Sequence, residues 1–338
     1  MTRRPENLLA APAPGAARRI ALSLLDAATA ARKRLPDAGD AEALHDFRVA
    51  MRRLRSTLRT YQPQLEAMVP AKLRRRLRDL ARATGEARDV EVQISWLERQ
   101  RHELPPARRA GVPWLLSRLT QRRERAYQDI RERIAPKFER LARRLRRALG
   151  SVAPPDATLP ASLASLIAQL LEDQGSDLER RLGLIRSAAN HAEAHAARIR
   201  VKRARYLLEP VVQEAKSAAA VVRRLKQVQQ LLGDLHDLQV VIVRLGDAAA
   251  EAAARGPRPA TSGLLALARV ARATQERLFR RLVSRRLARS LPGELTALAA
   301  ELRPAASPAV TPVAEWPSRA AARPPRPLPA RYTHRAGA

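Results

Sequence analysis

Residues 44–55 read LHDFRVAMRRLR, and this stretch predicts a helix with one basic face. At about 100° per helical residue, its basic and imidazole side chains fall within an arc of roughly 80°. They are His45, Arg48, Arg52, Arg55 and, one turn later, Arg59. Apolar residues such as Phe47 and Leu54 lie on the other side, where they can pack into a core. Like charges at helical neighbour spacing repel one another, so this stripe predicts a polyanionic partner.

The same pattern returns in the second half of the chain, where residues 195–205 read HAARIRVKRAR. With the two leading histidines aligned, both copies carry a base at the third, seventh, eighth and tenth following positions. The second copy contributes His195, Arg198, Lys202, Arg203 and Arg205. A charged stripe is most often a solvated helix face, but its duplication behind a leading histidine favours a binding surface.

A further element is also duplicated, because residues 84–92 read TGEARDVEV and residues 232–240 read LGDLHDLQV. Each copy follows a basic amphipathic run. Glycine ends helices readily, since a left-handed backbone costs it little. We therefore expect Gly85 and Gly233 to end a helix. Glu86 and Asp234 should then lie in the first turn of the next helix, where the macrodipole favours an acid. A repeat of this long period predicts two similar subdomains.

These duplicated motifs resemble the family named the conserved histidine α-helical domain, or CHAD. The resemblance rests on residues 45–55, 85–92, 195–209 and 225–240 and spans roughly residues 16–300. It implies an all-α fold of two pseudo-symmetric helical bundles whose basic faces converge on a central groove or pore. It also implies binding of inorganic polyphosphate. The two copies differ where Ala196-Ala197 stand in place of Asp46-Phe47, and where His236 stands in place of Arg88.

The composition agrees with a helical protein that meets anions. The chain has 338 residues and 64 Lys and Arg against 33 Asp and Glu, a net charge of +31. Such a charge favours polyphosphate, nucleic acid or anionic lipid as partner. Only 3% of the residues are aromatic, so Leu, Ala, Val and Ile must build the core. Cysteine is absent, which excludes disulfides and thiolate metal sites and fits a reducing compartment such as the cytoplasm.

Breaks in the helical patterning predict the domain boundaries. We expect a flexible N-terminus over residues 1–15, a first helical subdomain over 16–150, a linker over 151–160 and a second subdomain over 161–302. Residues 303–338 are rich in Pro, Ala and Arg without a period, which predicts a disordered basic tail. The sequence has no apolar run of about 18 residues or more, so we expect no membrane span.

Two other functions have some support in the sequence. The adjacent pairs His45-Asp46 and His236-Asp237 could belong to a metal-dependent phosphohydrolase. However, a catalytic metal needs three or more converging ligands, and the position matching His236 is Arg88, which cannot ligate a metal. We therefore expect no catalysis, no metal and no cofactor.

Nucleic-acid binding is the stronger alternative, because net charge alone does not separate it from polyphosphate binding. The sequence shows no zinc finger and no aromatic platform for stacking bases. A site rich in Arg and Lys but poor in aromatics suits an anion without bases. The preferred interpretation is a non-catalytic polyphosphate-binding module, with weak nucleic-acid binding left possible.

The predicted binding residues come from both copies of the repeat. The groove should be lined by Arg48, Arg52, Arg55, Arg198, Lys202 and Arg205, because Arg offers paired donors to phosphate oxygens and Lys a compact charge. His45 and His195 should donate hydrogen bonds. Arg53 and Arg203 should reach the rim or pair with Asp46, Asp89 or Asp237. Arg59 should bind as the last member of the first stripe, and the track of basic residues should be extended by Arg75, Arg78, Arg223 and Lys226. We expect a cytoplasmic protein, with polyphosphate granules as one possible location, and the oligomeric state stays open.

Overall fold

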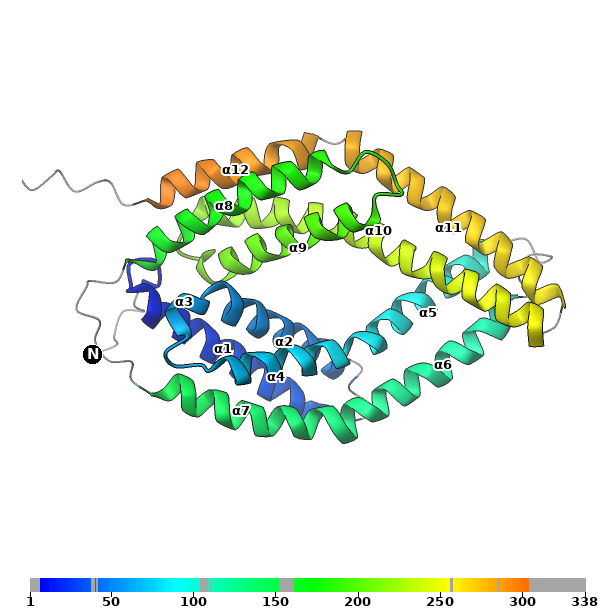
Figure 1. Ribbon diagram of the computed structural model, residues 1–338, viewed down its shortest axis with the longest axis horizontal. Helices are drawn as coiled ribbons and strands as arrows, with labels where there is room; N and C mark the ends of the chain where they lie inside the picture. The colour runs from blue at the N-terminus through cyan, green and yellow to red at the C-terminus, as the bar shows by residue number, and fades with distance from the viewer. Residues whose placement is uncertain are drawn as a thin grey trace, which may run out of the picture. The chain divides into compact units, whose positions relative to one another are not determined.

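The computed structural model describes residues 7–37, 40, 42–103, 109, 111–151, 161–255, 258–284 and 286–303. Within these ranges the regular elements are helices, apart from one isolated bridge between Pro12 and Ser162 (Figure 1). The predicted all-α fold is therefore confirmed.

The helices of the first half are α1 (Ala13–Arg34), α2 (Ala43–Thr60), α3 (Gln62–Leu65), α4 (Ala71–Ala83), α5 (Gly85–Glu103), α6 (Gly111–Asp129), the π-helix η2 (Ile130–Ile134) and α7 (Ala135–Gly150). Those of the second half are α8 (Leu163–Gly183), α9 (His191–Leu208), the 3-10 helix η3 (Glu209–Val211), α10 (Lys216–Arg255), α11 (Arg258–Ser284) and α12 (Arg286–Leu302).

The two halves pack their helices in the same way, as Figure 1 lets the reader follow. Helix α1 packs on α2 as α8 packs on α9. Helix α7 contacts α1 as α12 contacts α8, and α6 lies against α5 as α11 lies against α10. The predicted internal pseudo-symmetry is therefore present in the helix packing.

The halves differ at the duplicated glycine. In the first half the chain breaks at Thr84, whose hydroxyl donates to the Ala81 carbonyl at 3.0 Å, and Gly85 begins α5. In the second half α10 runs through Gly233 without a break. The prediction that Gly233 ends a helix is wrong, and so is the placement of Asp234 in a first turn. The reason is that buried Leu232 and Leu235 continue the apolar side of α10 across the glycine.

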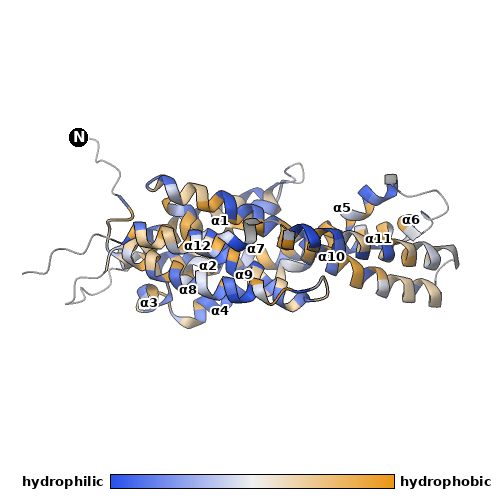
Figure 2. Ribbon diagram, turned by 90° about the horizontal axis from the view of Figure 1, so that it is seen from above, coloured by the Kyte–Doolittle hydropathy of each residue, from blue (hydrophilic) through white to orange (hydrophobic). Residues whose placement is uncertain are grey.

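The core consists of two apolar clusters, and each takes helices from both halves. The larger cluster joins α1, α2, α4 and α7 to α8, α9, α12 and the first part of α10. The smaller one joins α5 and α6 to α11 and the second part of α10. Figure 2 shows hydrophilic and hydrophobic residues interspersed along individual helices, as amphipathic helices that share a core require. The halves therefore do not have separate cores, and residues up to Pro304 form one compact unit.

The start of the chain departs from the expected flexible N-terminus. Residues 1–6 lie outside the described ranges, but residues 7–15 pack on the molecule. The backbone N–H groups of Leu8 and Leu9 donate to the carboxylate of Glu214 at 3.0 and 2.9 Å. Ala13 N–H donates to the Ala161 carbonyl at 2.9 Å, and α1 begins at that residue. These bonds fix a segment that carries too few periodic residues to be recognised from sequence.

The other predicted boundaries fall largely outside the described residues. Of the linker 151–160 the structure describes Ser151, and of the tail 303–338 it describes Arg303. The Arg303 guanidinium donates to Glu172 of α8 at 2.6 Å.

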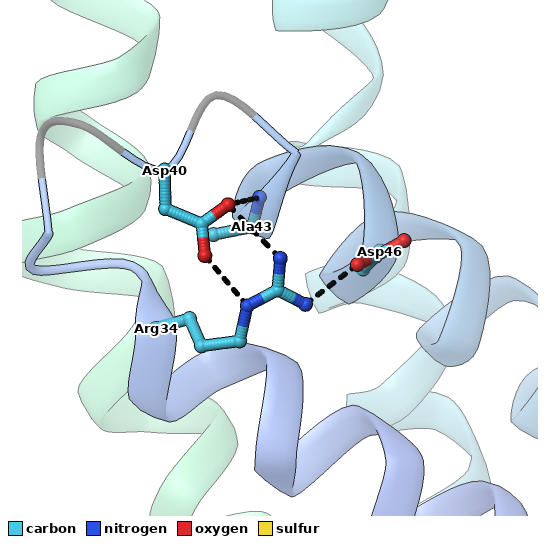
Figure 3. Close-up of polar contacts among 4 residues, drawn as sticks. All are labelled: Arg34, Asp40, Ala43 and Asp46. Atoms are coloured by element: carbon cyan, nitrogen blue, oxygen red, sulfur yellow. Dashed lines mark hydrogen bonds and ion pairs between the residues drawn. The ribbon is translucent and has the colours of Figure 1, made fainter.

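An ion-pair network fixes the start of α2, which carries the first basic stripe (Figure 3). Arg34 at the end of α1 contacts Asp40 and Asp46, each at 2.6 Å. Asp40 also accepts the backbone N–H of Ala43 at 3.0 Å, which satisfies a donor in the first turn of α2. Asp46 is thus a partner of Arg34.

Candidate functional site

The basic helices α2 and α9 lie in contact, and their cations converge. We call the α2–α9 cluster the side chains Arg48, Arg52, Arg55, Arg198, Lys202 and Arg205. Arg52 of α2 donates from Nε to the Tyr206 hydroxyl of α9 at 2.9 Å. This bond joins the two copies of the repeat directly. The structure therefore brings together the residues that were expected to line opposite sides of one site.

Lys202 lies among several guanidinium groups of both helices. Burial, together with the charges of Arg198, Arg52, Arg55 and Arg205, lowers its pKa from 10.5 to about 7, and burial has the largest effect. Two of these guanidinium groups come from α2 and two from α9. An ammonium group surrounded in this way loses its proton at a lower pH than an exposed lysine does, and an anion that joins the cluster would favour the charged form.

Arg48 and Arg198 occupy matching positions in the two halves. Arg48 is 9% exposed and pairs with Glu91 of α5 at 3.3 Å. Burial lowers the pKa of both guanidinium groups. In Arg198 the nearby carboxylate of Asp237 on α10 acts in the opposite direction.

Asp89 and Asp237 are the matching acids behind these arginines. Burial raises the pKa of both carboxyl groups, and Asp237 raises that of Asp89 further. Arg48, Arg122 and Arg88 hold the pKa of Asp89 down in part. The two acids therefore balance some of the cationic charge where α5 meets α10.

The end of the cluster nearest η3 is organised by Tyr206 and Glu209. Arg53 pairs with Glu209 at 3.3 Å, and Arg205 pairs with the other carboxylate oxygen at 3.2 Å. The guanidinium of Arg205 lies 4.7 Å from the centroid of the Tyr206 ring, and that of Arg53 lies 6.0 Å from it. Arg53 was expected to reach the rim or to pair with Asp46, Asp89 or Asp237, and the acid with which it pairs is Glu209 instead of these three. Sequence spacing did not reveal that the end of α9 lies beside α2.

Arg203 and Arg59 extend the basic region beyond the cluster. Burial, together with the charges of Arg59 and Arg200, lowers the pKa of Arg203 to about 10. Asp177 of α8 raises it in part, but that carboxylate pairs directly with Arg200 at 2.5 Å. The carboxylate that acts on Arg203 is thus that of Asp177, and not one of the three acids named as alternatives to a place at the rim.

In the described part of the chain, several arginines of the site have a side-chain donor without a protein partner. The Nε atoms of Arg48, Arg53 and Arg198 are buried and have no hydrogen-bond partner. A buried donor without a partner is costly, and it is available to an anion that enters the site.

The two leading histidines are not equivalent in space. The His195 ring lies 4.8 Å from the ring of His236, centroid to centroid. Burial and, to a smaller extent, the charge of Arg198 lower the pKa of both rings, and the pKa of His236 is lowered to about 4. His45 is exposed in the first turn of α2. Arg88 stands where His236 would be in the first half, so His45 has no matching ring beside it.

The residues expected to extend the track are exposed on α4 and α10. They are Arg75, Arg78, Arg223 and Lys226. Arg78 pairs with its neighbour Asp79 at 2.9 Å. Another residue of α4, Arg82, lies close enough to Arg55 to lower the pKa of that guanidinium. Sequence reasoning assigned no role to Arg82.

Two further residues of the site were missed. Arg88 of α5 acts electrostatically on both Arg48 and Arg198. The sequence feature that could have identified Arg88 is its alignment with His236 in the duplicated element. Tyr206 directly follows Arg205 and faces the core side of α9, where an aromatic ring suggests packing rather than a role in the site.

The described part of the chain has no group of three or more His, Cys, Asp or Glu side chains placed to hold a metal ion. None of its helices is both long and apolar enough to cross a membrane.

Comparisons with known proteins agree with this fold. The fold is similar to the crystal structure of the CHAD domain from the plant Ricinus communis, with 24% identity and a TM-score of 0.60 over 83% of this chain and 94% of that chain. It is also similar to PptA from Streptomyces chartreusis, with 20% identity and a TM-score of 0.54 over 83% of this chain and 99% of that chain. No curated protein matches the sequence. The family model of the CHAD domain matches residues 19–246, and the chain therefore belongs to the CHAD-domain family.

Proposed function

We propose that this protein binds inorganic polyphosphate through the basic side chains of the α2–α9 cluster. The observation that carries the proposal is the setting of Lys202, whose pKa is lowered to about 7 by burial and by guanidinium groups from both helices. A polyanion would relieve this repulsion and use the free Nε donors of Arg48 and Arg198. Membership of the CHAD-domain family supports the same ligand.

The extent of the cluster favours a chain of phosphates over a single phosphate. From Arg48 to Arg59 the basic side of α2 is about 16 Å long, at a rise of 1.5 Å per residue. Arg203 and Arg205 extend the charge on α9. An extended ligand can therefore contact several cations at once.

Polyphosphate suits the site better than nucleic acid does. The aromatic ring within the α2–α9 cluster is that of Tyr206, and the guanidinium of Arg205 covers it at 4.7 Å. A base would have to displace that arginine to stack on the ring, whereas phosphate oxygens need only the guanidinium donors.

We propose a binding or granule-targeting role without catalysis, in the cytoplasm. If the protein were instead a metal-dependent phosphohydrolase, polyphosphate incubated with it and Mg²⁺, Mn²⁺ or Zn²⁺ would be shortened. Phosphate release that is lost in His236→Ala would support that alternative.

A competition titration tests the ligand. Long-chain polyphosphate, DNA and RNA of equal total charge would compete for the protein at moderate salt, with fluorescent polyphosphate as the reporter. We expect polyphosphate to displace the reporter at the lowest charge concentration. Equal or better competition by DNA or RNA would favour the nucleic-acid alternative.

A further inference from the structure

We propose a second polyphosphate site, separate from the α2–α9 cluster, in a trough that follows α6, η2 and α7. Two cavities of about 480 and 620 Å³ adjoin there, because Ala83 and Asp129 contribute to the walls of both. The first cavity lies between α6 and α10, and the second lies between α4 and α7. We call them together the α6–α7 trough. The proposal rests on polyphosphate being the ligand of this protein.

A single helical run forms one wall of the trough. Helices α6, η2 and α7 follow one another without a break from Gly111 to Gly150. On the side facing the cavities, a basic residue recurs every three or four positions from Arg118 to Arg144, with one interruption at Asp129. At 1.5 Å per residue this stripe is about 39 Å long.

The π-helix keeps the stripe on one side. In an α-helix each step of four residues turns the side chain by about 40°, so repeated steps of four would carry the stripe away from the trough. Between Arg125 and Lys137 every step is four residues. The wider turn of η2, in which Ala135 N–H bonds to the Ile130 carbonyl, offsets this rotation.

The trough has more positive charge than its own acids can balance. Each acid in its walls already has an arginine partner: Glu86 with Arg122 at 2.7 Å, Glu251 with Arg118 at 2.5 Å, Asp129 with Arg133 at 2.9 Å and Asp79 with Arg78 at 2.9 Å. Within the described residues, the lining cations without a carboxylate partner are Arg76, Arg125, Lys137, Arg140, Arg144 and Arg244. The Nε of Arg244 is also buried without a hydrogen-bond partner.

This arrangement fits an extended inorganic polyanion. Unpaired cations at intervals along about 39 Å can each meet a phosphate group of one chain. The side chains described in the two cavity walls include no aromatic ring on which a base could stack. Helix α4 separates the trough from the first site, since Arg76 lines the trough while Arg82 lies beside Arg55.

Isothermal titration with tripolyphosphate at low salt tests the proposal, because this short chain can report each site separately. Wild-type protein should show two binding events per chain. The variant Arg140→Glu with Arg144→Glu should lose one event, and Arg198→Glu with Lys202→Glu should lose the other. The matched control is Arg269→Glu with Arg272→Glu, which reverses two exposed charges on α11 and should retain both. Circular dichroism would show that each variant keeps its helices.

Two binding events retained in Arg140→Glu with Arg144→Glu would overturn the second site and leave the proposed function intact. Loss of an event in that variant but not in Arg198→Glu with Lys202→Glu would support the trough and refute the α2–α9 site. Absence of binding by the wild type would refute both. RNA that displaces tripolyphosphate from the Arg198→Glu, Lys202→Glu variant at equal charge would overturn the assignment of polyphosphate to the trough.

Discussion

At the scale of single residues, Lys202 links the binding of a polyanion to pH. Its pKa in the free protein is about 7, against an ordinary value of 10.5, so it is largely neutral above pH 7. A bound polyanion favours the charged form and raises this pKa. Binding should therefore take up a proton between pH 7 and 10.5, and affinity should fall as pH rises, by up to about tenfold per unit. Titrations at several pH values, in buffers of different ionisation enthalpy, measure both effects.

Lys202→Arg is the control for this prediction. Arginine keeps a positive charge throughout the same range, so the variant should show a flatter pH dependence and a smaller proton uptake. A pH dependence as steep as that of the wild type would assign the effect to another group.

The sequence was sufficient to identify the six cations of the α2–α9 cluster, because periodicity and repetition show which side chains share a helix face. It did not reveal contacts between helices that are distant in sequence. Tyr206, which accepts from Arg52, and Arg88, which acts on both Arg48 and Arg198, depend on how α2, α5 and α9 meet. The pairing of Arg53 with Glu209 depends on the same packing.

At the scale of helices, a substitution at Gly233 tests whether α10 is continuous at this position. It lies inside a helix of 40 residues, and an added Cβ would meet the Arg198 Nε at 3.8 Å, an ordinary contact. Gly233→Ala should therefore stabilise the protein by about 0.5–1 kcal/mol, since alanine has the higher helix propensity. Chemical denaturation followed by circular dichroism gives the change in free energy of unfolding. Destabilisation would indicate that this position is a genuine break.

Gly111→Ala is the opposite case at the start of α6. An added Cβ there would lie 2.8 Å from the Ala260 carbonyl oxygen of α11 and 2.8 Å from Leu264 Cγ. The substitution should destabilise the protein, because backbone atoms cannot move aside cheaply. The two glycines show why the sequence predicted the helical class but not each helix end. Whether a glycine ends a helix, continues it or allows a close contact depends on residues that are distant in sequence and near in space.

At the scale of the whole molecule, the tail should be dispensable for binding. The cations of both proposed sites lie before Arg303. A chain ending at Leu302 should stay helical and keep its affinity for polyphosphate within tenfold, or about 1.4 kcal/mol. Equilibrium titrations of the two chains give the comparison. A larger loss would make residues 303–338 part of the binding surface.

The two halves of the repeat should act as one site in the α2–α9 cluster. Arg52 contacts Tyr206 across the halves, and Lys202 is surrounded by cations of both helices, so a ligand that meets one helix lies within reach of the other. A ligand held by one helix is then at a high effective concentration near the other helix, which favours the second contact. Arg48→Glu with Arg52→Glu should therefore weaken the α2–α9 binding event as severely as Arg198→Glu with Lys202→Glu, by more than tenfold in each case. Each variant should also show a shallower dependence of log affinity on log salt, because fewer counterions are released.

Two independent half-sites would give a different result. Either double variant would then leave the other helix binding at its normal affinity, with only the stoichiometry reduced. Titration calorimetry in the Arg140→Glu, Arg144→Glu background separates these outcomes, because it removes the proposed contribution of the α6–α7 trough. An unchanged affinity with half the stoichiometry would refute the single site, even with polyphosphate as the ligand. The apolar sides of α2 and α9 are untouched by these substitutions, and glutamate is a good helix former, so the helices should persist in both variants.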